Sequence, residues 1–569
     1  MDKRWFNVAI VAVLGMLLNA CASTAIRQST TASTSKPQSV HAVARDKDLP
    51  LKLMAAEFAI QRNDLATAAK DYAEASQLSS DVAIAEQATR LALASKQWDL
   101  ARTSLQRWQT LDPDSTGVLQ SKAWIALADD DLEPAYAALS ALATRSAENR
   151  WRPIAQVLIS SENKQQAARL LDRLATPQRL GDSDQDWVAM SQLAFKLDDK
   201  ALAGRLSSEA VKRFKSADAY AWSAQLALDR GDTKVARQEF AAALKRDPEN
   251  LRLRTGYAAL LADNGDNAAA ASALASGTQT DVVYGARAAY VLRSEDKSLL
   301  ASLYREIEAD KSTRSGKRLY LLGQLAELIG KDGEALDWYR QLPETDEHWF
   351  DAGMRIVVLS DKAGRAADSA SRLAQLRLAA GSNTSEAVDL SLLQAQLLIE
   401  KSENAAALKV YTEGLQQAPD ESRLLYARAM LSIEMDDLVA GERDLRKVLA
   451  INPESADALN ALGYTLVDRT DRLDEATALI EKAIKIKPDE PAIIDSYGWA
   501  QYRLGNLDEA VKYLRKAYSK QPDSEVAAHL GEVLWVSGKQ EEAKRIWEQG
   551  RKKDADNKVL IETMKRLRP

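Results

Sequence analysis

A short motif of small and large apolar residues returns every 33 to 35 positions along most of this chain. It is clearest between residues 453 and 555, where each copy holds a glycine and, further along, an alanine that precedes a large apolar residue. Apolar residues three or four positions apart indicate one face of an amphipathic helix, and prolines end or begin helices. Each copy therefore predicts two helices joined by a turn. The copies carry Gly463, Ala476 and Ile480; Gly498, Ala510 and Leu514; and Gly531, Ala543 and Trp547; they are closed by Pro453, Pro488 and Pro522.

The same columns continue toward the N-terminus. A fixed period kept through most of a chain indicates a stack of repeats, and an unrelated helical bundle would not keep it. The columns blur between Val282 and Lys317, which predicts an irregular unit or a hinge at 291–318. We expect an N-terminal array over 51–290 and a C-terminal array over 319–569, ended by a charged capping helix from Lys558. Upstream pairs include Ala68 and Tyr72, Ala101 and Leu105, Ala135 and Leu139, Ala236 and Phe240, Ala335 and Tyr339, and Ala407 and Tyr411.

This pattern of small and large residues resembles the tetratricopeptide repeat, a helix–turn–helix unit of about 34 residues. The resemblance implies an all-α superhelical solenoid of about 13 such units. The residue types fit its packing, because Gly463, Gly498 and Ala224 would lie where two helices nearly touch. A large side chain at these positions would wedge the helices apart. Ile480, Leu514 and Phe240 would then fill the space between units.

The first 20 residues have the pattern of a bacterial export signal. Lys3 and Arg4 precede an apolar run over 8–18 that is too short to span a bilayer. Leu18-Asn19-Ala20-Cys21 resembles the lipobox, which implies cleavage before Cys21 and attachment of acyl chains, palmitate among them, to that single cysteine. Ala22 rather than aspartate after it implies, by the same resemblance, the outer membrane and a periplasmic orientation. The alternative is an ordinary signal peptide with an incidental cysteine.

Residues 21–50 are expected to form the lipidated cysteine and a flexible tether. The segment is rich in Ser, Thr, Ala and Gln and shows no apolar periodicity. Such a composition buries too little surface to offset the entropy of the chain. A coil of this length would reach roughly 30 Å, which holds a folded body away from the lipid headgroups.

Composition argues against several functions. The formal net charge of −6 and the balanced charges disfavour a nucleic acid partner, which requires a concentrated basic face. The three histidines, His41, His348 and His529, share no zinc-site spacing, and the chain has no phosphate-binding loop and no nucleophile elbow. We therefore expect no catalytic residues, no metal, no cofactor and no small-molecule substrate.

The functional surface of a repeat array is normally its concave face, which the first helix of each unit lines in this family. Aromatic residues on such a face favour partner binding, because Trp and Tyr are common at interface hot spots. Packing against neighbouring units is the alternative. We expect Trp499, Tyr502 and Trp535 to be dispensable for folding, since Leu514 and Trp547 already fill the space between units. The predicted partner-binding residues are Tyr426, Met430, Asn460, Tyr464, Asp495, Trp499, Tyr502, Glu532 and Trp535.

Acidic residues at the edges of this face, Asp495 and Glu532, favour an extended peptide or a folded partner with basic features. The basic pair that would accompany Asn460 in a carboxylate clamp is missing. The whole architecture resembles the lipoprotein adaptors that bind and activate a periplasmic carboxyl-terminal processing protease acting on cell-wall hydrolases. Two alternatives stay open: an assembly scaffold for an exopolysaccharide, pilus or secretion machine, and an enzyme with an unrecognised site.

Overall fold

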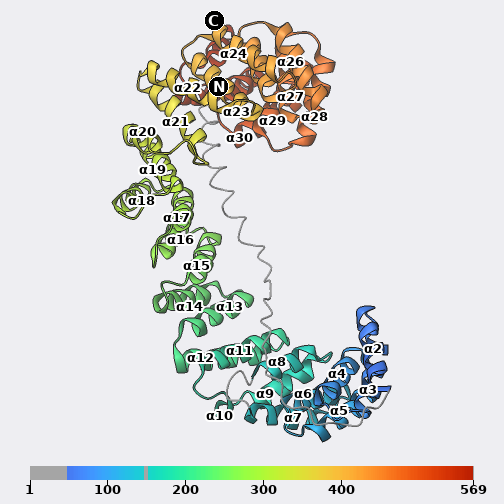
Figure 1. Ribbon diagram of the computed structural model, residues 1–569. Coiled ribbons are helices and arrows are strands. Elements are labelled where there is room, and N and C mark those ends of the chain that lie inside the picture. Colours follow the sequence, from blue (N-terminus) through green and yellow to red (C-terminus); the bar gives the residue numbers. More distant parts are fainter. Residues whose placement is uncertain (1–47, 146–150, 568–569) are drawn as a thin grey trace. The chain divides into compact units, whose positions relative to one another are not determined.

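The computed structural model describes residues 48–145 and 151–567, which form 32 helices and contain no β-strand (Figure 1). Cys21, the expected signal peptide and most of the expected tether lie outside the described residues. The first described helix, α2 (Asp48–Gln61), begins three residues before the boundary expected after Pro50. Proline is accommodated there because the backbone N–H groups of the first helical turn have no partner within the helix.

The chain divides into two compact units between Ile307 and Glu308, inside α18 (Lys297–Ala309). The N-terminal unit also contains α3 (Leu65–Gln77), α4 (Val82–Ala94), α5 (Trp98–Leu111), α6 (Thr116–Ala128), α7 (Leu132–Arg145), α8 (Trp151–Ser160), α9 (Lys164–Leu174), α10 (Pro177–Leu180), α11 (Asp184–Lys196), α12 (Lys200–Phe214), α13 (Ala217–Asp229), α14 (Thr233–Arg246), α15 (Leu251–Asp263), α16 (Asn267–Ala275) and α17 (Asp281–Arg293). The C-terminal unit contains α19 (Gly316–Leu328), α20 (Asp332–Arg340), α21 (Trp349–Lys362), α22 (Ala366–Ala380), α23 (Thr384–Glu400), α24 (Asn404–Gln417), α25 (Ser422–Glu434), α26 (Leu438–Ile451), α27 (Ala456–Arg469), α28 (Leu473–Ile486), α29 (Pro491–Arg503), α30 (Leu507–Lys520), α31 (Ser524–Val536), α32 (Gln540–Lys553) and α33 (Lys558–Leu567).

Helices pack in consecutive pairs, and the turn inside most pairs contains one residue with a positive φ. This left-handed conformation suits Gly, Asn and Asp best. In several turns the next residue is an aspartate that caps the second helix through its side chain. Gly231 and Gly265, and likewise Gly330 and Gly364, are 34 residues apart, and all four are turn residues. The positive-φ turn residues include Asn63, Lys96, Asp130, Asp198, Gly231, Gly265, Gly330, Gly364, Ser402, Asp436, Gly505 and Gly538.

A second set of glycines lies inside helices, where the two helices of a pair touch. A Cβ atom added to Gly463 would lie 2.6 Å from Ile480 Cγ1, and one added to Gly498 would lie 2.7 Å from Leu514 Cγ. Gly531 leaves the same kind of space for the indole of Trp547. These separations are shorter than van der Waals contact, so no larger residue fits without movement. The predicted close approach at Gly463 and Gly498 is confirmed.

Buried arginines explain why the pattern blurs between Val282 and Lys317. Arg287 on α17 is 7% exposed and donates to Glu306 and to Gln279. Arg318 on α19 is 5% exposed and donates to Asp310 at 2.8 Å. Buried charges need such partners. These paired long side chains occupy interior space. The helices α17, α18 and α19 still follow one another through this stretch, with the non-helical residues 310–315 before α19.

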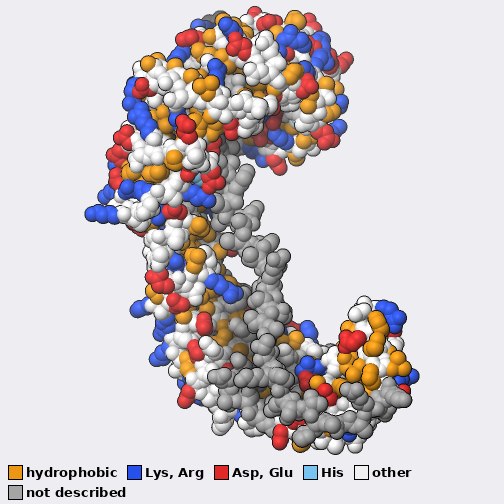
Figure 2. Space-filling view, viewed as in Figure 1, with side chains coloured by type: hydrophobic (Ala, Val, Ile, Leu, Met, Phe, Trp, Pro, Cys, Tyr) orange, Lys and Arg blue, Asp and Glu red, His pale blue; other side chains and the backbone are white. Residues whose placement is uncertain are grey.

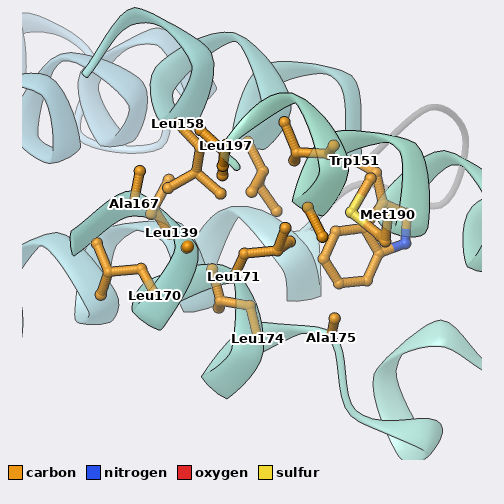
Figure 3. Close-up of a cluster of buried hydrophobic side chains, with 14 of the residues drawn as sticks. Leu139, Trp151, Leu158, Ala167, Leu170, Leu171, Leu174, Ala175, Met190 and Leu197 are labelled. Atoms are coloured by element: carbon orange, nitrogen blue, oxygen red, sulfur yellow. The ribbon is translucent and has the colours of Figure 1, made fainter. Parts of the chain in front are cut away.

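The N-terminal unit holds a large apolar core made by several consecutive helices. Figure 3 shows leucines from α7, α8 and α9 converging on one another, with Trp151 and Met190 beside them. Leu139, Leu158 and Leu171 are completely buried. Burying a side chain of this size stabilises the fold by roughly 1.5–3 kcal/mol. The stacked pairs are therefore held together mainly by the interior that they share.

The C-terminal unit has a continuous core that runs from Val388 on α23 to Leu560 on α33. The final helix, α33, packs against α31 and α32 and fully buries Leu560. Figure 2 shows charged side chains of both signs interspersed over the visible face, which agrees with the nearly balanced composition. None of the described helices combines the length and the apolar character that crossing a membrane requires.

Candidate partner-binding face

The predicted partner-binding residues lie on the first helices of four successive pairs in the C-terminal unit. Three of them, Tyr464, Trp499 and Glu532, each directly follow a packing glycine, so the repeat places them at the same position of their helices. The set comprises Tyr426 and Met430 on α25, Asn460 and Tyr464 on α27, Asp495, Trp499 and Tyr502 on α29, and Glu532 and Trp535 on α31.

His529 on α31 stands at the centre of a polar and aromatic network that joins three first helices. Its Nδ1 lies 2.8 Å from Asp495 Oδ2, and its Nε2 lies 3.2 Å from the hydroxyl oxygen of Tyr464. Its ring stacks on Trp499, with the ring centroids 4.3 Å apart. The Tyr464 hydroxyl also lies 3.4 Å from Glu525 Oε1, to which it donates. We call Tyr464, Asp495, Trp499, Glu525 and His529 the His529 cluster.

The His529 ring carries a positive charge at neutral pH. Burial by itself lowers the pKa of this imidazole, but the neighbouring carboxylate of Asp495 raises it, and the net pKa is about 9. Both ring nitrogens therefore donate, one to Asp495 and the other to Tyr464. Burial, with the nearby carboxylates, also raises the pKa of the Tyr464 hydroxyl well above its usual value. A protonated imidazole has no free lone pair, so the His529 ring itself is not a general base at neutral pH.

Glu532 belongs to a second, smaller network. Its carboxylate accepts a hydrogen bond of 3.1 Å from the Tyr502 hydroxyl. It also forms an ion pair with Arg566 on α33, with 2.5 Å between nitrogen and oxygen. Glu532 is only 3% exposed. The final helix thus neutralises a carboxylate that the sequence pattern assigned to an acidic edge, because that carboxylate is used inside the fold.

The structure corrects the expectation that these side chains form an open wall. Asp495 and Trp499 are 6% and 7% exposed, and the Trp535 ring packs against Trp547 with centroids 5.5 Å apart. The reason is that α27, α29 and α31 contact one another directly, so their inward side chains fill the space between first helices. Trp499 is core, and its truncation would not leave folding unchanged.

Part of the predicted set keeps contact with solvent. Six of the nine side chains are half-buried. They form the accessible part of the face, and the tyrosine and tryptophan rings among them offer apolar area to a partner. These residues are Tyr426, Met430, Asn460, Tyr464, Tyr502 and Trp535.

Three buried polar atoms on this face have no hydrogen-bond partner among the described residues: Asp495 Oδ1, Asn460 Oδ1 and Trp499 Nε1. Buried polar atoms are nearly always paired, so each unpaired one calls for an explanation such as a water molecule or a ligand. Two of the three are acceptors. The face therefore has two buried acceptors for which the described residues supply no hydrogen-bond donor.

Sequence reasoning missed His529, Glu525 and Arg566. The sequence pattern presents His529 only as a possible metal ligand. The signal that could have found it is the spacing of the pairs, since Asp495 and His529, like Glu532 and Arg566, are 34 residues apart. One repeat length separates residues on adjacent first helices, so opposite charges at that spacing predict a cross-helix pair.

The remaining histidine and metal predictions concern other regions. His348 stacks on Tyr320 with ring centroids 4.8 Å apart. His41 and Cys21 lie outside the described residues. Within 48–145 and 151–567, no group of three or more His, Cys, Asp or Glu side chains is arranged to hold a metal ion.

Curated relatives cover only part of the chain. A TPR repeat-containing protein of Pseudomonas aeruginosa is 45% identical over 211 residues, which are 37% of this chain and 35% of that protein. The Bacteriophage adsorption protein A of Escherichia coli is 30% identical over 109 residues, 19% of this chain and 11% of that protein. The chain thus spans about a third or less of the length of these relatives.

Solved structures give distant likenesses. A chain in the structure of Naa15/Naa10 bound to HypK-THB aligns with 91% of this chain, over 96% of its own length, at 13% identity and a TM-score of 0.33. TTC0263, a TPR protein of Thermus thermophilus, aligns with 31% of this chain, over 96% of its own length, at 17% identity and a TM-score of 0.28.

Two family models described as tetratricopeptide repeat match the sequence, one over residues 321–552 and the other over residues 227–293. Together they span more than half of the chain and cover the helices that carry the candidate face. The all-helical structure, with its paired helices and its glycines at helix contacts, has the packing that such repeats require. The chain therefore belongs to the tetratricopeptide-repeat family.

Proposed function

We propose that this protein is a scaffold that binds protein partners along the first-helix face of its C-terminal unit. The observation that carries the proposal is the succession of half-buried aromatic and apolar side chains on consecutive first helices, from Tyr426 to Trp535. Partly exposed rings in a row supply contact area at low entropic cost, which is the usual composition of a protein interface. The repeat fold presents them on a long, regular surface.

The finer proposal is that the scaffold is a lipid-anchored, periplasm-facing protein of the outer membrane. Its support is the signal-like N-terminus, the lipobox resemblance around Cys21 and the polar segment that follows. We propose further that it recruits and activates a carboxyl-terminal processing protease, and that it brings this protease to cell-wall hydrolases. The support is the combination of lipobox, tether and repeat array, together with a repeat-containing relative in Pseudomonas aeruginosa.

A capture experiment tests the function directly. The full chain, tagged at its C-terminus and expressed in its own host, is purified from detergent-solubilised envelopes, and the bound proteins are identified by mass spectrometry. We expect a carboxyl-terminal processing protease among them. A second arm mixes the purified protease with a wall hydrolase, with and without the scaffold, and measures the rate of cleavage.

The outcomes separate the candidates. Faster cleavage in the presence of the scaffold supports the adaptor. Retention of pore or synthase subunits without a protease would replace it with an assembly scaffold. Loss of all partners at an ionic strength that leaves the fold intact, judged by helical content, would contradict a stable scaffold of either kind.

A further inference from the structure

The His529 cluster lies in a region of unbalanced negative charge. The carboxylates of Asp468, Asp495 and Glu525 all act electrostatically on His529 and on Tyr464. The protonated His529 ring pairs with Asp495, whereas neither Asp468 nor Glu525 forms an ion pair with a lysine or arginine side chain of the described residues.

The other cations nearby are already used. Arg566 on α33 pairs with Glu532. Arg503 on α29 donates to the backbone carbonyl oxygens of Asp468 and Thr470, at 3.2 and 3.4 Å. Arg503 also lies 3.9 Å from the carboxylate of Asp471. Among the described residues, neither arginine pairs with the carboxylate of Asp468, Asp495 or Glu525.

The unbalanced charge can be reached from solvent. Glu525 is exposed, and Asp468 and Tyr464 are half-buried, whereas His529 itself is only 3% exposed. An approaching group therefore meets the two accessible carboxylates and the Tyr464 ring before it meets the buried imidazole. Aromatic rings attract cations to their faces, which adds to the attraction of the carboxylates.

The unpaired atoms specify what such a group should carry. Asp495 is 6% exposed, its Oδ2 faces His529, and its Oδ1 has no donor within the part of the chain that the structure describes. Asn460 Oδ1, one helical turn before Tyr464, likewise lacks a donor there. Both acceptors are buried, so a side chain that supplies the missing donor must carry it at the end of a narrow stem. The head groups of lysine and arginine combine several N–H donors, a positive charge and an apolar stem.

We propose that the His529 cluster, together with Asp468 and Asn460, binds the head group of a lysine or arginine side chain of the protein partner. The inference rests on the proposed function, because it names the chemistry by which the first-helix face holds its partner. Glu525 and Asp468 attract the cation, the Tyr464 ring contacts its stem, and Asp495 Oδ1 and Asn460 Oδ1 accept its hydrogen bonds. The His529 ring holds the Asp495 carboxylate in place through the other oxygen.

The small number of histidines makes the cluster observable. The sequence contains three, so selective ¹³Cε1 labelling of histidine gives few resonances, and the His529→Gln variant assigns the one from the cluster. The full mature chain is titrated with N-acetyl-arginine amide, with N-acetyl-lysine amide and with N-acetyl-citrulline amide, the uncharged analogue of the arginine probe. We expect the two cationic probes to shift the His529 resonance saturably at millimolar concentration, and the citrulline probe to leave it in place. Potassium chloride at equal concentration controls for ionic strength.

Charge-removing variants then locate the site. Glu525→Gln should weaken binding of the arginine probe about tenfold, which corresponds to about 1.4 kcal/mol. Glu548→Gln, an equal change of charge at an exposed position of the second helix α32, should leave binding unchanged. Asp468→Asn is the second test. An unshifted His529 resonance with both cationic probes, or an equal shift with citrulline, overturns the proposal.

Partner capture separates this inference from the proposed function. If Glu525→Gln and Asp468→Asn lose the arginine probe and also release the captured partner, both ideas stand. If the cluster binds neither cationic probe while the full chain still captures its partner, the proposed scaffold function is supported and the proposed lysine or arginine site is refuted. If the probes bind and no partner is captured by the full chain, the proposed function fails instead.

Discussion

Gly498 provides a sharp test of the packing between the two helices of a repeat. We expect Gly498→Ala to destabilise the C-terminal unit, because the added Cβ would lie 2.7 Å from Leu514 Cγ and 3.1 Å from the backbone nitrogen of Leu514. A side-chain rotation can relieve the first contact but not the second. Overpacking of this kind costs roughly 1–3 kcal/mol.

The matched control is Gly333→Ala in the same unit. Gly333 lies in α20, and a Cβ added to it would meet no atom within 4 Å among the described residues. Both substitutions restrict the unfolded chain equally, which by itself stabilises by about 0.4–1 kcal/mol. The free energies of unfolding of the two variants should therefore differ by roughly the overpacking cost, 1–3 kcal/mol.

Thermal and urea unfolding, followed by circular dichroism at 222 nm, measure this difference. In a unit of this size each kcal/mol corresponds to about 2–4 °C in Tm. The helical content of both variants before unfolding checks that neither has lost its fold. If Gly498→Ala unfolds at or above the temperature of Gly333→Ala, the two helices do not touch at Gly498 and the register of the repeats is wrong.

Three further predictions use other parts of the chain. Cys21→Ser should prevent lipidation and leave the protein unprocessed or mislocalised, and normal outer-membrane fractionation of the variant would contradict the lipobox interpretation. Although burial lowers the pKa of His529, Asp495 raises it from 6.5 to about 9, so the protonated ring contributes stability that is fully present below pH 6.5 and is lost as pH rises through about 9. The stability advantage of the native chain over His529→Gln in urea titrations should accordingly shrink by roughly 3 kcal/mol between pH 6 and pH 10, and a constant difference would refute the ion pair with Asp495. Gly285→Ala, inside α17 where a Cβ meets no described atom within 4 Å, should raise the stability of the N-terminal unit by up to about 1 kcal/mol, and a loss measured by the same unfolding assay would contradict the open space.

The sequence by itself determined the fold class and much of the local packing. The period of small and large residues dictates paired helices, and the same period places Gly463 and Gly498 against the second helix of their pairs. This information is local, because a helix of known phase decides which side chains face its nearest neighbour in the chain. The sequence also placed the nine predicted partner-binding residues on the first helices.

The tertiary structure alone decided how much of that face is free. Whether Trp499 meets solvent or His529 depends on how closely α27, α29 and α31 approach one another, and that distance depends on all the side chains between them. The ion pairs of Asp495 and Glu532 likewise depend on partners one repeat away, His529 and Arg566. A repeat pattern fixes the phase of each helix but not the contacts between successive first helices, since these contacts vary with every residue that replaces the consensus.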